Sequence, residues 1–143
     1  MGLDNIPKEY PCRSKGTAVL VDDRIDCQAT QAAGGCPWLN AGPPEEGRVL
    51  GMFGTDCWYR GKYGNYLLGE EMTMVDEDMT HLTFYGDNED GTEKSADSCL
   101  VLADFIKDHI TEVSDEENHN ALVYAQWYLR WVAAECGGLV CWY

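Results

Sequence analysis

The sequence predicts an α+β fold: a small, mostly antiparallel sheet with two C-terminal helices and a Cys-rich, loop-rich N-terminal region. Short β-branched and aromatic runs between turn residues predict the strands. Apolar residues that recur every three or four positions after residue 95 predict the helices. With 143 residues the chain fits a single domain, made of a loop-rich segment (1–69), an acidic hairpin and helix (70–118), and a central helix with a final strand (119–143).

The N-terminal segment shows few signals of regular structure. Residues 17–23 (TAVLVDD) predict a strand because they are mostly apolar and β-branched. Residues 26–47 are rich in Gly and Pro, which predicts a long loop with one helical turn over 28–33 that Gly34 ends. Residues 48–54 (RVLGMFG) predict another short strand.

The stretch GTDCWYRGKYGNYL, residues 54–67, places four aromatic residues beside two cations in a strongly acidic chain. We interpret Gly61 and Gly64 as turn or bulge positions between strands. Arg60 and Lys62 then point the same way, because side chains two positions apart share one face of a strand. Two readings stay open: an exposed edge whose cations pair with nearby acids, or a small-anion site with an aromatic platform. The candidate ligand-binding residues of the second reading are Trp58, Tyr59, Arg60, Lys62 and Tyr63.

The segment after residue 70 predicts a hairpin and then an irregular loop. Residues 71–75 and 79–85 flank the acidic turn 76–78, and polar and apolar residues alternate over 80–85. Residues 86–98 are polar and contain two glycines, which predicts a surface loop.

Two helices are predicted to follow. The first runs from about Ala96 to Glu112, with Ser95 as its N-cap. Its apolar residues recur at helical spacing and predict a buried stripe. These residues are Cys99, Leu102, Phe105, Ile106, Ile110 and Val113.

The second helix is predicted to begin at Ser114, whose hydroxyl would cap the amide of Glu117 in a capping box. It ends at Gly137 and Gly138, where glycines typically stop helices. Aromatic residues cover most of its circumference, which indicates a central helix. Residues 139–143 (LVCWY) predict a final strand.

The net charge of −15 is concentrated in one segment. Residues 70–118 have a net charge of −14, whereas residues 1–69 and 119–143 have net charges of −1 and zero. Such a field attracts basic surfaces and repels nucleic acid, so we expect no direct nucleic-acid binding. The candidate partner-binding residues are Asp104, Asp108 and Glu112, which share a helix ridge, and Asp115, Glu116 and Glu117 at the start of the next helix.

Four of the seven cysteines lie within the first 57 residues. An odd count and an N-terminus without a signal pattern argue against a secreted disulfide scaffold. Cys12, Cys27, Cys36 and Cys57 could bind a structural zinc ion, although eight residues separate Cys27 from Cys36, more than in usual zinc knuckles. Zinc, disulfides and separate buried thiols all stay open.

Neither a membrane segment nor a catalytic constellation is predicted. No apolar run approaches the roughly 20 residues that cross a bilayer, so we expect a cytoplasmic protein. Cys57 followed by Trp58 is similar to the pattern around papain-type nucleophiles, but Thr55 and Asp56 replace the upstream Gly and Cys of that pattern. No phosphate loop, dinucleotide fingerprint or His-x-x-x-His pair occurs.

The segments MGLDNIP, GGCPW and GTDCWYRGKYGN resemble those of small uncharacterised proteins of tailed bacteriophages. The resemblance covers mainly the first 70 residues. It implies a location in the host cytoplasm but no activity and no functional residues. Phage accessory proteins often inhibit host defence, and acidic ones sometimes imitate DNA, which is an analogy independent of fold.

These observations favour a non-enzymatic acidic binding protein or inhibitor that engages a basic host protein, such as a nucleic-acid-binding one. Two alternatives stay open. One is a binder or enzyme for a phosphate-like or nucleotide-like molecule that uses Arg60, Lys62 and the neighbouring aromatics. The other is a structural component of the virion.

Overall fold

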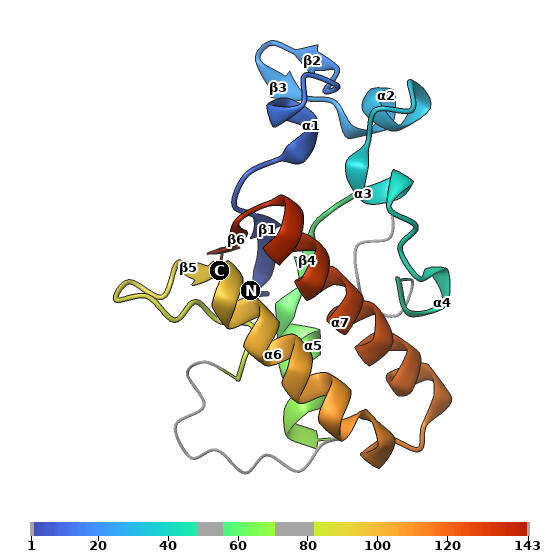
Figure 1. Ribbon diagram of the computed structural model, residues 1–143, viewed down its shortest axis with the longest axis vertical. Coiled ribbons are helices and arrows are strands. Elements are labelled where there is room, and N and C mark those ends of the chain that lie inside the picture. The colour runs from blue at the N-terminus through green and yellow to red at the C-terminus, as the bar shows by residue number, and fades with distance from the viewer. Residues whose placement is uncertain (1, 49–55, 71–81, 143) are drawn as a thin grey trace.

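The computed structural model describes residues 2–48, 56–70 and 82–142, and its fold is α+β, as predicted (Figure 1). Four short strands form an antiparallel sheet in the order β4-β1-β6-β5. The strands are β1 (Asp4–Pro7), β4 (Tyr59–Arg60), β5 (Glu93–Ser95) and β6 (Gly138–Trp142). No helix among the described residues is long and apolar enough to cross a bilayer.

Three helices form a body beside this sheet: α5 (Gly61–Glu70), α6 (Ala96–His109) and α7 (Glu116–Glu135). The 3₁₀ helix η1 (Ile110–Glu112) extends α6, and α6 and α7 lie side by side in Figure 1. The predicted helices and the final strand are confirmed, and α7 is the central helix. Its buried residues are Ala121, Leu122, Tyr124, Ala125, Tyr128, Leu129, Trp131 and Val132.

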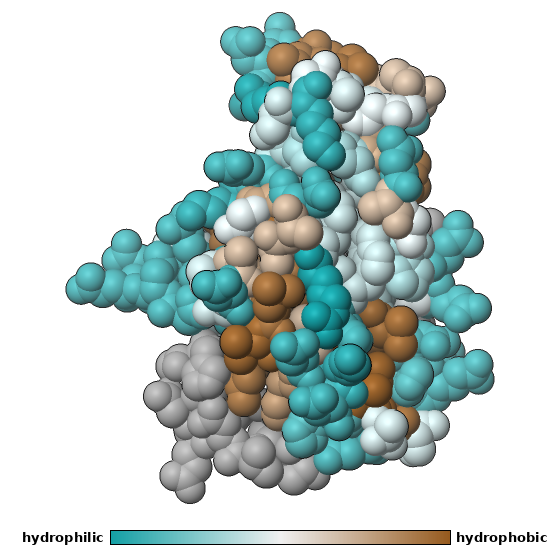
Figure 2. Space-filling model, viewed as in Figure 1, coloured by the Kyte–Doolittle hydropathy of each residue, from teal (hydrophilic) through white to brown (hydrophobic). Residues whose placement is uncertain are grey.

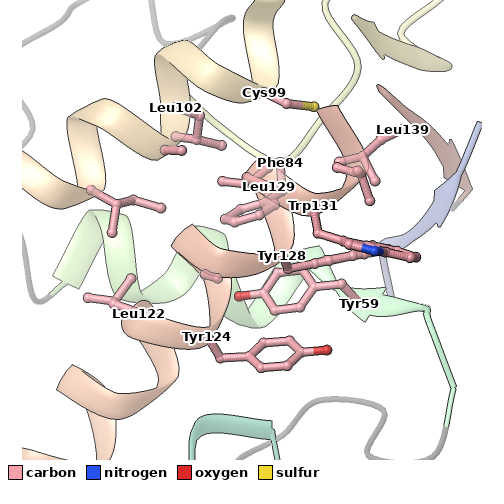
Figure 3. Packing of buried hydrophobic residues seen from close by; sticks show 14 of the residues in the cluster. Tyr59, Phe84, Cys99, Leu102, Leu122, Tyr124, Tyr128, Leu129, Trp131 and Leu139 are labelled. Atoms are coloured by element: carbon pink, nitrogen blue, oxygen red, sulfur yellow. The ribbon is translucent and has the colours of Figure 1, made fainter. Parts of the chain in front are cut away.

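The core is built around aromatic rings from distant parts of the chain (Figure 3). The Tyr59 ring lies 4.9 Å from that of Phe84, 5.3 Å from that of Tyr128 and 6.0 Å from that of Tyr124. Such tilted and offset arrangements stabilise aromatic clusters beyond the burial of area alone. The cluster therefore ties β4 and the segment around Phe84 to α7.

The N-terminal region, residues 8–48, contains only short elements, and the first of them, up to residue 32, extend beyond the body at the top of Figure 1. They are α1 (Pro11–Ser14), β2 (Leu20–Val21), β3 (Arg24–Ile25), α2 (Cys27–Ala32), α3 (Pro37–Asn40) and α4 (Glu45–Arg48). The last of these packs closely on α7, because a Cβ atom at Gly47 would lie 2.1 Å from the carbonyl oxygen of Asn120.

Two predictions for this region need correction, and one is confirmed. The strand over 17–23 is reduced to β2, because Asp22 and Asp23 adopt φ angles of 51° and 65° and turn the chain into β3. The long loop over 26–47 instead contains three short helices. The helical turn over 28–33 is confirmed within α2, and Gly34 follows it with a φ of 76°.

The strand predicted over 48–54 falls mainly outside the described residues. Arg48 is the last residue of α4, and residues 49–54 are not described. The hairpin predicted over 71–85 is likewise described only from residue 82, and residues 82–85 form no strand. The alternation of its side chains is present, because Leu82 and Phe84 are buried and Tyr85 is exposed.

The prediction that the aromatic stretch 54–67 forms strands around turn glycines is wrong after Arg60, where α5 begins. The glycines permit close packing instead of turns. A Cβ atom at Gly61 would lie 1.9 Å from Asn5 Oδ1, and one at Gly64 would lie 2.5 Å from Phe84 Cε2. Helix α5 therefore needs glycine, which has no Cβ atom, at the positions where it packs against the core.

The predicted cap of the first helix is confirmed, and that of the second is shifted by one residue. Ser95 Oγ accepts from the Ser98 amide at 3.2 Å, as expected. The second cap is Asp115, whose Oδ2 accepts from the Asn118 amide at 3.0 Å, in place of Ser114. The surface loop predicted over 86–98 contains β5, and α6 begins within it at Ala96.

Candidate functional site

The four N-terminal cysteines come together around one cavity. Cys12 lies in α1, Cys27 begins α2, Cys36 is the N-cap of α3 and Cys57 precedes β4. All four line a cavity of about 20 Å³, which also contacts Tyr10, Asp56, Trp38 and Trp131. The predicted ligand set is therefore adjacent in space, although its members are up to 45 positions apart in sequence.

Local sequence signals position three of these thiols. Proline starts both α1 and α3, where its fixed φ suits the first helical turn. Asp26 caps α2 by accepting from the Ala29 amide at 3.0 Å, which places Cys27 at the first helical position. The sulfur of Cys36 accepts from the Leu39 amide at 3.5 Å.

All seven cysteines are free thiols, and burial raises the pKa of Cys12, Cys27 and Cys57. These thiols are protonated at neutral pH, and a protonated thiol is a poor nucleophile. Among the described residues, no three His, Cys, Asp or Glu side chains are arranged to hold a metal ion as they stand. The cavity thus brings four sulfur donors together without directing them at one point.

The residues of the predicted small-anion site do not share one face. Tyr59 is fully buried in the core, which leaves it no surface for a ligand. Arg60 is exposed on β4 opposite Asp4, whereas Lys62 is exposed on α5. Because the strand ends between them, the two cations lack the common direction that strand geometry would impose.

The two remaining aromatics of that predicted site bind other parts of the protein. The indole nitrogen of Trp58 donates to the Tyr10 hydroxyl at 2.9 Å, and its ring meets that of Trp142 edge-on at 6.1 Å. The Tyr63 hydroxyl donates to Asn118 Oδ1 at 3.3 Å. Burial, partly offset by the Trp58 bond, raises the pKa of Tyr10 to about 12.

The predicted acidic ridge on α6 is exposed, but it is partly neutralised. Arg130 on α7 donates to Asp104 at 2.9 Å and neutralises that carboxylate, while the His109 ring lies within hydrogen-bond distance of Glu112, at 3.2 Å. Within the described residues, Asp108 forms no ion pair. The ridge therefore presents less uncompensated charge than its sequence indicates.

The three acids at the start of α7 have a local structural role. Asp115 is the N-cap, and Glu116 and Glu117 occupy the first turn. Acidic side chains there stabilise the partial positive charge of the helix N-terminus. All three are also exposed, so the same residues remain accessible to a partner.

The outward face of α6 carries a feature that the sequence analysis missed. Leu100 and Val101 are 39% and 48% exposed, beside the acidic positions Asp97, Asp104 and Asp108. Figure 2 shows hydrophobic and hydrophilic residues side by side over this helix. The signal was present in the sequence, since both apolar residues lie outside the buried stripe of Cys99, Leu102 and Ile106. We call this surface the α6 face, defined by residues 97, 100, 101, 104 and 108.

No protein-family model matches the chain, and neither a curated protein nor a solved structure shows significant similarity to it.

Proposed function

We propose that the protein is a non-enzymatic binding protein whose α6 face engages a basic protein surface. The observation that carries the proposal is the composition of this face, in which Leu100 and Val101 are exposed beside the acidic residues Asp97 and Asp108, while Asp104 pairs with Arg130. An apolar centre with a charged rim is the usual anatomy of a protein interface. Burial of the two apolar side chains against a partner would stabilise the complex, and the acidic side chains would attract and orient a basic partner.

The negative field is broader than this face and supports the same partner chemistry. Asp115, Glu116 and Glu117 are exposed at the end of the α6–α7 pair, beyond Asp108. These acids contribute to the net charge of −14 over residues 70–118, which disfavours a nucleic-acid ligand. The proposal includes the phage origin and host-cytoplasm location that the resemblance implies. In its specific form, the protein inhibits a nucleic-acid-binding protein of the host.

Charge reversal with a matched control tests the proposal. Basic proteins captured from a bacterial host lysate would be identified, and their association rates with the purified protein measured at low and high ionic strength. We expect Asp97→Lys/Asp108→Lys to slow association at least tenfold at low ionic strength, because electrostatic steering changes association rates by 10-fold or more. The control, Glu89→Lys/Asp90→Lys, makes the same charge change in the exposed loop before β5.

The control separates the α6 face from net charge alone. A partner that the control variant retains and the α6 variant loses supports the proposal. Equal losses in both variants, or no loss in either, would contradict it. Asp104 is left in place, because its replacement would also break the contact with Arg130.

The small-molecule alternative has less support. A groove of about 530 Å³ beside Tyr10 and Trp58 contains two cations, Arg13 and Arg24, in place of the predicted Arg60 and Lys62. Two carboxylates, Asp23 and Asp56, line the same groove. The two pairs balance in formal charge, so the groove does not favour an anion.

A further inference from the structure

The part of the N-terminal region that precedes α3 has little core of its own. Between residues 8 and 48, the buried hydrophobic side chains are Cys12 and Trp38, beside Pro11 and Pro43. Leu20, Val21 and Leu39 are exposed. Trp38 and α4 are held by contacts with α7, whereas α1, β2, β3 and α2 bury little apolar surface. Small units with so little core usually need disulfides, metals or a partner to hold their structure. The feature that α1, α2 and α3 share instead is a free thiol in or beside each helix, at Cys12, Cys27 and Cys36.

We propose that Cys12, Cys27, Cys36 and Cys57 together bind one zinc-class metal ion in a tetrahedral thiolate site. The metal would connect α1, α2 and α3 to the segment that leads into β4. A tetrahedral set of sulfur donors selects zinc or iron over calcium and magnesium, which prefer oxygen.

The dimensions of the cavity fit an ion better than an organic molecule. Its volume of about 20 Å³ is close to that of a single water-sized probe, which occupies roughly 10 to 15 Å³. Rotation of each cysteine about its Cα–Cβ bond moves the sulfur while the backbone stays in place. The four thiols line one small cavity but are not directed at one point as they stand, so metal binding would require cysteine side chains to rotate toward a shared centre.

Two contacts around the cavity would support the site. The Leu39 amide already donates to the Cys36 sulfur, and such bonds orient and stabilise metal-bound ligands. The carbonyl oxygen of Cys57 accepts from the hydroxyl of Tyr128, a buried residue of α7. One ligand is therefore fixed to the body, and the other three come from the region that needs support.

Metal content is the first measurement. Protein produced with zinc available should contain about one zinc ion per chain. Metal-free protein titrated with Co²⁺ should develop the intense near-ultraviolet thiolate-to-cobalt absorption and the visible bands of tetrahedral cobalt. Metal-free protein should also show faster amide hydrogen exchange in residues 8–48, while α6 and α7 keep their protection.

Cysteine variants then identify the ligands. Each of Cys12→Ala, Cys27→Ala, Cys36→Ala and Cys57→Ala should reduce zinc content several-fold and weaken the cobalt bands. The matched controls, Cys99→Ala and Cys136→Ala, remove buried thiols that do not line the cavity and should retain the metal. Wild-type protein without zinc or cobalt absorption would overturn the proposal, and so would loss of metal in the Cys136 variant with retention in the Cys27 variant. The cobalt titration uses the wild-type protein, so its result stands even if a variant fails to fold.

Discussion

The body and the N-terminal region of this protein hold their structures in different ways. In the body, α7 alone buries eight residues, against α6, α5, the sheet and the short helix α4 of the N-terminal region. In the N-terminal region, two hydrophobic side chains and two prolines are buried over some 40 residues, and four thiols meet at one cavity. Apolar packing can specify the first structure by itself, whereas the second needs specific links between short segments. The difference indicates that the two regions respond differently to the loss of a single buried side chain.

Two buried tryptophans offer the most demanding test of this difference. Trp131 lies on α7 with 7% exposure, and Trp38 lies on α3 with 1% exposure and donates to the Tyr124 hydroxyl at 3.2 Å. Trp131→Ala should lower the free energy of unfolding by about 3 to 5 kcal/mol, because it removes a large buried side chain of α7, which also lines the cysteine cavity. Trp38→Ala should release mainly residues 8–48 and leave the amides of α6 and α7 protected. Denaturant unfolding combined with hydrogen exchange measures both effects.

An exposed tryptophan provides the control for this pair. Trp142 is 60% exposed, so Trp142→Ala should change stability by less than about 1 kcal/mol. If Trp38→Ala destabilised α6 and α7 as much as Trp131→Ala does, the two regions would form one cooperative unit and the comparison would fail.

Within the body, the glycines of α5 test how closely the helix packs on the core. Gly64→Ala would place a methyl group 2.5 Å from Phe84 Cε2 and 2.9 Å from the Tyr59 hydroxyl, so we expect a loss of about 1 to 3 kcal/mol. Gly69→Ala has open space around the new methyl group and should stabilise the helix by about 0.5 to 1 kcal/mol. Thermal or denaturant unfolding of both variants measures the difference. Stabilisation by Gly64→Ala would mean that this face of α5 is not packed as described.

The sequence could predict the elements whose apolar residues recur at a regular spacing, and it missed those that depend on other interactions. The buried stripe of α6 and the aromatic surface of α7 have a clear helical period, and both helices are confirmed. The strand β5 has no such pattern, because its buried residue is Lys94, which pairs with Asp87 at 3.4 Å. A buried lysine in a strand looks like a loop residue in sequence. The start of α5 was missed because its glycines serve tertiary packing, which depends on residues far away in the chain.

The candidate sites were predictable to a similar, limited extent. The four cysteines were selected from their unusual density in a segment with few apolar runs, and the structure places them around one cavity. Their spacing could not show this, because α1, α2 and α3 separate them. The α6 face was only half recognised. Asp104 and Asp108 were predicted from their helical spacing, whereas Asp97, Leu100 and Val101 were not, because two apolar residues outside the buried stripe give no periodic signal.

The smallest expected effect concerns the start of α7, where structural and charge roles fall on one residue. Asp115 caps the helix, so Asp115→Ala should cost about 1 kcal/mol through loss of the bond to the Asn118 amide. Asp115→Asn keeps an equally good cap and removes the charge, so it should change stability by only a few tenths of a kcal/mol. Ser114→Ala should have an equally small effect, because Ser114 is not the cap. Measurements of the free energy of unfolding of the three variants decide between the two caps. A larger loss of stability for Ser114→Ala than for Asp115→Ala would mean that Ser114 is the cap, as the sequence predicted.

The Asp115→Asn variant has a further use in the binding experiment. Its stability should match that of the wild type, so any change in association rate reports the contribution of the charge to partner recognition.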